Sequence, residues 1–164
     1  MFRSYTYGEL QLEEIPEKIL DYVEKMKKYE VCPIITFGTD SQNFHYTKMV
    51  SVIVVTIPGH GGIFFYEVTN KERVVDVRNK LRMETNYSLE LADRFISILE
   101  NNEKFSELYL TASFSIHIDA GNSDRGKTRD LIPELVGWVK SMGFDCETKP
   151  ASYAASSVAN KLSK

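Results

Sequence analysis

The sequence predicts an α/β fold in which a mixed five-stranded sheet carries helices on both faces, with an extra helix at the N-terminus. Three runs rich in β-branched and aromatic residues follow one another with only short turns between them, which predicts an antiparallel meander. Helical segments then alternate with two further strand-like runs, which predicts two parallel strands. With 164 residues the chain can bury one substantial core, so we interpret 1–164 as one domain that carries 1–30 as a helical extension.

The first element is an amphipathic helix over residues 10–30. Its apolar positions recur with helical spacing and form one face, comprising Leu12, Ile15, Ile19, Tyr22, Val23 and Met26. Proline is tolerated in the first turn of a helix, so Pro16 places the start of the regular helix around residues 13–16. This face is expected to cover one side of the sheet.

The meander comprises strands at residues 31–39, 46–57 and 63–69. The first is an apolar run that leads to Asp40, and the polar segment 41–43 is expected to form the turn after it. The second is dominated by valine and isoleucine, and the Gly- and Pro-rich segment 58–62 marks the next turn. Short connections of this kind join antiparallel neighbours.

The second half alternates helices and strands. The predicted elements are a long helix over residues 71–101, a strand at 113–119, a helix over 128–142 that ends at Gly143, a short strand at 144–148 and a final helix of small residues over 153–164. Parallel strands need such crossovers. The order of elements is therefore α-βββ-α-β-α-β-α.

Composition excludes several classes of protein. The formal net charge is -3, whereas a protein that coats nucleic acid is basic overall. The charge is compatible with a nucleic-acid enzyme whose site is built from carboxylates, because a bound metal ion restores positive charge. Cys32 and Cys146 stand far apart and are expected to be reduced, buried thiols. The sequence shows no signal segment and no membrane-spanning run, so we expect a cytoplasmic protein that does not enter membranes.

Three carboxylates hold positions that require a partner. Asp40 and Asp119 each end an apolar strand, and Glu84 lies in the apolar stripe of the long helix. If the two strands are neighbours, the three groups converge. Clustered carboxylates repel one another and suit Mg²⁺ or Mn²⁺, and one or two such ions can support phosphodiester hydrolysis. The structural alternatives are that Asp40 begins a turn and that Glu84 pairs with an arginine or a backbone amide.

Residues 121–128 match the pattern G-x-x-x-x-G-K-T between a strand and a helix, which is typical of a phosphate-binding loop. A nucleotide-binding core of that kind needs several parallel strands after the loop, and only one more strand is predicted here. We therefore favour another role, in which Arg125 and Lys127 contact a nucleic-acid backbone. His117 is interpreted as a hydrogen-bonded core histidine, with a place beside the acidic site as the alternative.

Several short sequence segments resemble the YkuK-type ribonuclease H-like family of bacterial proteins. They are Gly-Thr-Asp-Ser-Gln at 38–42, Glu-Thr-Asn-Tyr-Ser-Leu-Glu-Leu-Ala at 84–92, Ile-His-Ile-Asp at 116–119 and Ser-Tyr-Ala-Ala-Ser-Ser-Val-Ala at 152–159. The resemblance runs from about residue 31 to the C-terminus. It implies the ribonuclease H-like fold, with Asp40, Glu84 and Asp119 as catalytic and metal-ligating residues.

The sequence differs from this family at two positions near its end. Where that group carries acidic residues near the end of the chain, this sequence has Ala151 and Asn160. The wider fold uses a fourth carboxylate on its last helix to hold a second metal ion, so the site is expected to hold one ion, or to use the amide oxygen of Asn160 as a ligand.

The leading hypothesis is a metal-dependent nuclease that acts on structured nucleic acid, either DNA or RNA. The first alternative is a non-catalytic nucleic-acid-binding or scaffolding module that retains the fold, and the second is a phosphate-loop nucleotide binder. Further expected contacts to nucleic acid are Ser41, Gln42 and Lys149.

Overall fold

The computed structural model describes residues 1–121 and 128–164. Its strands are β1 (Phe2–Ser4), β2 (Gly8–Leu10), β3 (Ile34–Asn43), β4 (Thr47–Thr56), β5 (Gly62–Lys71), β6 (Ser113–His117) and β7 (Asp145–Glu147). Its helices are α1 (Ile15–Met26), α2 (Val77–Glu100), α3 (Ser106–Thr111), α4 (Ile132–Ser141), the π-helix η5 (Ala154–Ala159) and α5 (Asn160–Ser163). Four short 3-10 helices flank them among the described residues: η1 (Leu12–Glu14), η2 (Lys27–Tyr29), η3 (Glu103–Phe105) and η4 (Arg129–Leu131).

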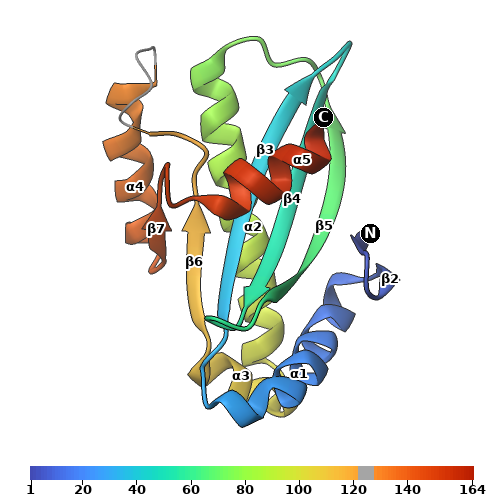
Figure 1. Cartoon of the computed structure of the whole chain (residues 1–164). Helices are drawn as coiled ribbons and strands as arrows, with labels where there is room; N and C mark the ends of the chain where they lie inside the picture. Colours follow the sequence, from blue (N-terminus) through green and yellow to red (C-terminus); the bar gives the residue numbers. More distant parts are fainter. Residues whose placement is uncertain (122–127) are drawn as a thin grey trace.

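The strands form one mixed sheet in the order β2-β1-β5-β4-β3-β6-β7. β3, β4 and β5 are the predicted antiparallel meander, and β6 and β7 add to it in parallel. Helix α2 lies behind the sheet in Figure 1, whereas η5 and α5 cross its front. The mixed α/β class with helices on both faces is therefore confirmed.

The predicted number of strands was wrong, because the sheet has seven strands rather than five. The N-terminal extension is not only helical: β1 and β2 form a hairpin that joins the edge of β5, where Arg3 is the partner of Tyr66. Phe2 and Leu10 are buried in the core. Strands of three residues are too short to show an alternating pattern, which is why the sequence did not reveal them.

Three local predictions also need correction. Residues 41–43 continue β3 and pair with β4, so they are not a turn. The long helix begins at Val77 rather than near Lys71, because Asp76 caps it by accepting a hydrogen bond from the Asn79 amide. Cys32 is exposed, not buried. The other predicted helices and strands are present, within a few residues of the expected bounds.

The two faces of the sheet differ in what covers them. The inner face packs Ile35, Phe37 and Ile116 against α2, where the Phe37 and Phe95 rings lie 5.7 Å apart. On the outer face Val50, Val52 and Val54 pack against Ala154 and Ala159 of η5, in a separate apolar cluster. Side chains alternate between faces along a strand. Thr36 and Asp40 therefore share the outer face of β3, and Ser41 faces α2.

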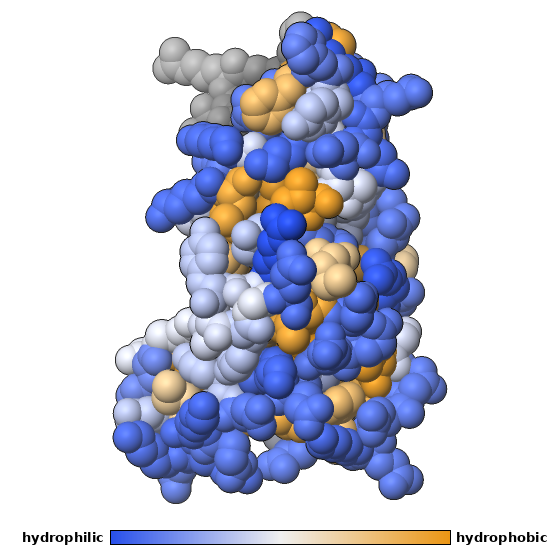
Figure 2. Space-filling model, turned by 90° about the vertical axis from the view of Figure 1, so that its right-hand side faces the viewer, coloured by the Kyte–Doolittle hydropathy of each residue, from blue (hydrophilic) through white to orange (hydrophobic). Residues whose placement is uncertain are grey.

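Seen from the side of β5 and the N-terminal hairpin, the apolar residues on the surface form separate patches divided by hydrophilic ones (Figure 2). That face is therefore not one broad hydrophobic interface. Among the described residues, no helix combines the length and the apolar character needed to cross a membrane.

Candidate functional site

The three predicted carboxylates line one small cavity at the carboxyl end of β3. Its volume is about 190 Å³, and Asp40, Glu84 and Asp119 reach it from β3, α2 and the segment after β6. The sheet brings the first and last together because β6 pairs in parallel with β3, so that both strands end at the same edge. The wall also includes Ser41, Lys80 and Thr128. The predicted convergence of these groups is thus present in the structure.

Glu84 is the most deeply buried of the three, with 9% of its surface exposed. The Ser41 hydroxyl donates to Glu84 Oε1 at 2.5 Å. Burial raises the pKa of Glu84 from its ordinary 4.5 to about 8, because desolvation outweighs the opposing effect of the Ser41 hydrogen bond, and the nearby charge of Asp40 adds to the rise. Without a cation, Glu84 therefore carries a proton at neutral pH.

Asp40 is held from the C-terminal helix. The Ser163 hydroxyl, which is fully buried, donates to Asp40 Oδ2 at 2.6 Å. Burial raises the pKa of Asp40, the Ser163 hydrogen bond acts against it, and the charge of Asp119 raises it further. Both raised pKa values have the same origin: a group of acids is shielded from water, and its members disfavour each other's ionisation.

Asp119 is paired with a lysine from the segment after β7. Lys149 Nζ lies 3.1 Å from Asp119 Oδ1, an ion-pair distance. The same oxygen is buried, so its charge needs a cation close by, and the Lys149 ammonium group supplies one. A metal ion in the cavity would compete with Lys149 for this oxygen.

A second lysine approaches the cavity from α2. Lys80 lies one turn before Glu84, donates to the Ser41 carbonyl at 3.4 Å and lowers the pKa of both Asp40 and Glu84 by its charge. Within residues 1–121 and 128–164, no group of three or more His, Cys, Asp or Glu side chains is arranged closely enough to hold a metal ion. The carboxylates share a cavity, and two lysines act as counter-charges around it.

The structure does not bring every predicted site residue to this cavity. Asn160 donates to the Ser156 carbonyl at 3.4 Å within the final helix and is not among the residues that line it. Gln42 is exposed on β3, opposite Lys48 of β4. Arg125 and Lys127 lie outside the described residues. His117 is buried, and its Nδ1 accepts the Ala154 amide at 3.1 Å, so it is the hydrogen-bonded core histidine that the sequence favoured.

Sequence reasoning missed two residues, Lys80 and Ser163. Lys80 could have been found, because residues four apart share one side of a helix and Glu84 was already placed. Ser163 could not, since 123 residues separate it from Asp40 and no local pattern connects them.

Comparisons with known proteins give a family model, a bacterial relative and a solved structure that are similar to this chain. The family model described as Ribonuclease H-like matches residues 14–164. The chain is 28% identical over 171 residues to "Uncharacterized protein YkuK" of Bacillus subtilis (strain 168), which covers 100% of this chain and 97% of that protein. Among solved structures, "Structure of Mos1 transposase catalytic domain and Raltegravir with Mg" matches with a TM-score of 0.35 and 11% identity, over 94% of this chain and 73% of that one.

Proposed function

Because the chain belongs to the ribonuclease H-like family, we propose that it is a divalent-metal-dependent nuclease that hydrolyses phosphodiester bonds of structured nucleic acid. The observation that carries the proposal is the meeting of Asp40, Glu84 and Asp119 in one cavity at the carboxyl end of two parallel strands. Three carboxylates from three separate elements, two of them with raised pKa values, form an arrangement that a cation would stabilise.

The chemistry of the three carboxylates suits Mg²⁺ or Mn²⁺, and their side chains would draw closer together than they stand in this structure to hold one ion. Both ions prefer hard oxygen ligands, and the buried Asp119 oxygen, which Lys149 neutralises in the metal-free protein, is a ligand of that kind. Asp40, Glu84 and Asp119 would hold the ion. When bound, such an ion supplies an activated water and compensates the charge that develops on the leaving oxygen.

Side chains next to the carboxylates fix their positions and compensate their charge. Ser41 orients Glu84 and Ser163 orients Asp40, each through one short hydrogen bond. Glu84 must lose its proton before it can bind a cation, so ion binding and deprotonation are linked. We assign Lys149 two successive partners: it neutralises Asp119 before the ion arrives and is then available to a substrate phosphate.

Lys149→Met tests this exchange, because methionine keeps a long side chain without charge. We expect the affinity for Mn²⁺ to rise severalfold, since the ion no longer competes with the ammonium group, and the affinity for nucleic acid to fall. Calorimetric titration measures both. The control is Lys25→Met on α1, at the far end of the molecule, which removes the same charge. Unchanged or weaker Mn²⁺ binding by Lys149→Met would refute the assigned role.

A second function is favoured by one observation. The residue that contacts Asp40 from the last helix is Ser163, which has no charge, and lysines already neutralise part of the acidic group. A module that binds nucleic acid without cleaving it would show this arrangement. Cleavage of a labelled panel of hybrids, junctions and single strands, in Mn²⁺ and in chelator, separates the two functions, because only the nuclease yields metal-dependent products.

Ser163→Asp tests whether helix α5 takes part in the metal site. The substitution places a carboxylate beside Asp40, and metal-site affinity rises with the charge of the ligand set. We expect tighter Mn²⁺ binding, by severalfold, and lower stability in chelator. Ser163→Asn is the matched control, with the same size and no charge. Equal Mn²⁺ affinities of the two variants would mean that α5 takes no part in the metal site.

A further inference from the structure

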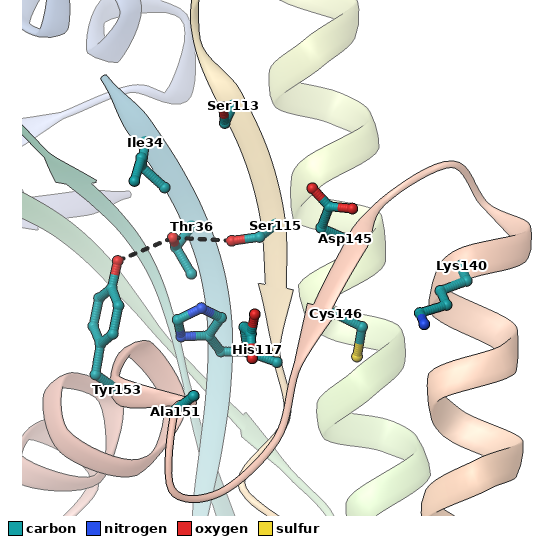
Figure 3. A pocket seen from close by; sticks show the side chains of 11 residues that line it. Ile34, Thr36, Ser113, Ser115, His117, Lys140, Asp145, Cys146, Ala151 and Tyr153 are labelled. Atoms are coloured by element: carbon teal, nitrogen blue, oxygen red, sulfur yellow. Dashed lines mark hydrogen bonds between the residues drawn. The ribbon is translucent and has the colours of Figure 1, made fainter. Parts of the chain in front are cut away.

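A second cavity, of about 500 Å³, lies on the outer face of the sheet beside the acidic site (Figure 3). Its floor is formed by β3 and β6, with Thr36, Ser115 and His117, and one wall is formed by Ala151 and Tyr153. Helices η5 and α5 cross β3 and β4 but not β6 (Figure 1), and the cavity lies beside them. The volume is in the range of cavities that hold small molecules.

The floor offers two hydrogen-bond donors to a ligand. Thr36 Oγ1 lies 3.2 Å from both Ser115 Oγ and Tyr153 OH. Three hydroxyl groups carry three protons and these two hydrogen bonds use two, so one of the three hydroxyls keeps a proton for a ligand. His117 Nδ1 accepts the Ala154 amide, which places the ring proton on Nε2, and no other described residue hydrogen-bonds to that nitrogen.

The opposite edge of the cavity is acidic. Asp145 and Glu147 of β7 stand in register with Ser115 and His117, and both line the cavity, together with Lys140 of α4. Two carboxylates against one ammonium group disfavour a phosphate inside the cavity. They favour a neutral group that donates hydrogen bonds, such as an exocyclic amine.

The cavity and the acidic site share a wall. In the segment from residue 149 to 153, Lys149 pairs with Asp119 on one side while Ala151 and Tyr153 line the cavity on the other. Thr36 and Asp40 lie on the same face of β3, about 13 Å apart along the strand. Residues 149–153 lie between the two cavities, so a strand of nucleic acid with a phosphate at Asp40 would cross this segment to place a nearby nucleotide in the second cavity.

We infer that this cavity binds an unpaired, amine-bearing nucleobase (adenine, cytosine or guanine) of the nucleic acid held at the acidic site. Ring nitrogens or carbonyls of the base accept from His117 and the hydroxyl chain, and its amine donates to Asp145 or Glu147. The half-exposed ring of Tyr153 offers an aromatic surface to the base, as in proteins that read single strands. The inference rests on the proposed function, since it takes nucleic acid as the ligand.

The test uses nucleosides, which carry no phosphate and require neither metal nor cleavage. Adenosine, cytidine, guanosine and uridine are titrated into the full chain in chelator, while side-chain NMR signals of His117 and Tyr153 are followed. We expect saturable shifts with the three amine-bearing nucleosides and binding of uridine about five- to tenfold weaker. Tyr153→Phe and Glu147→Gln should each weaken cytidine binding severalfold.

Two controls separate this result from the nuclease proposal. Tyr87→Phe, in a different cavity, should bind nucleosides like the unaltered chain, and so should Asp40→Asn, whatever its cleavage activity. The inference is overturned if no nucleoside gives saturable shifts, if the shifts appear away from His117 and Tyr153, or if uridine binds as well as cytidine. Loss of cleavage with retained nucleoside binding would count against the nuclease proposal alone.

Discussion

Asp40→Asn is expected to abolish metal-dependent cleavage while leaving the fold intact. Asparagine has the shape of aspartate, and its amide oxygen can still accept the Ser163 hydroxyl, so the contact between β3 and α5 is retained. What is lost is the negative charge that a cation needs. Substitution of outer partners in metal sites costs about 10–100-fold, and loss of a ligand should cost more, so we expect a fall of at least about a hundredfold.

The measurement is the rate of product formation from the labelled substrate panel in Mn²⁺, together with a thermal melt of each variant. Asp93→Asn is the matched control, because it removes the same charge from an exposed position of α2. Its rate should equal that of the unaltered chain. Cleavage by Asp40→Asn at the unaltered rate would exclude this cavity as the catalytic site.

Glu84 is expected to make the stability of the metal-free protein depend strongly on pH. Its pKa is 4.5 in the unfolded chain and about 8 in the folded one, because the folded protein buries it. Below pH 4.5 both states hold the proton. Between these values only the unfolded state loses it, so the free energy of unfolding falls as pH rises. The total loss by pH 8 is on the order of 4 kcal/mol, and the raised pKa of Asp40 acts in the same direction.

Urea unfolding in chelator across this pH range measures the effect. Glu84→Gln cannot ionise and should flatten the slope, whereas Glu90→Gln, exposed on the same helix, should leave it unchanged. Mn²⁺ should stabilise the unaltered chain more at pH 8 than at pH 5, because the ion binds the ionised carboxylate. A slope that persists in Glu84→Gln would show that Glu84 is not the group responsible.

The parts of the fold that the sequence predicted are those with strong local patterns. Runs of β-branched residues predicted the three strands of the meander. Glu84 was expected to be buried because it falls within the apolar stripe of α2. The family resemblance, based on short phrases, is confirmed over the full chain. The start of α2 was also readable in principle, because Asp76 is a good helix cap.

The features that the sequence did not reveal depend on contacts between distant residues. No periodic or local pattern in the sequence indicates these contacts, which are Arg3 with Tyr66, Ser163 with Asp40 and Lys149 with Asp119. The same holds for the open outer face beside Tyr153, which exists because the final helix crosses β3 and β4 rather than β6. Sequence patterns predicted the three carboxylates that line the acidic cavity, and the fold determines which partners surround them.

Anomalous scattering from crystals grown at alkaline pH with Mn²⁺ shows whether Asp40, Glu84 and Asp119 hold one cation jointly. We expect an anomalous peak within ligand distance of all three carboxylates, with Lys149 displaced from Asp119. A well-ordered site with no peak there, or a peak held elsewhere while Lys149 remains on Asp119, would contradict this expectation.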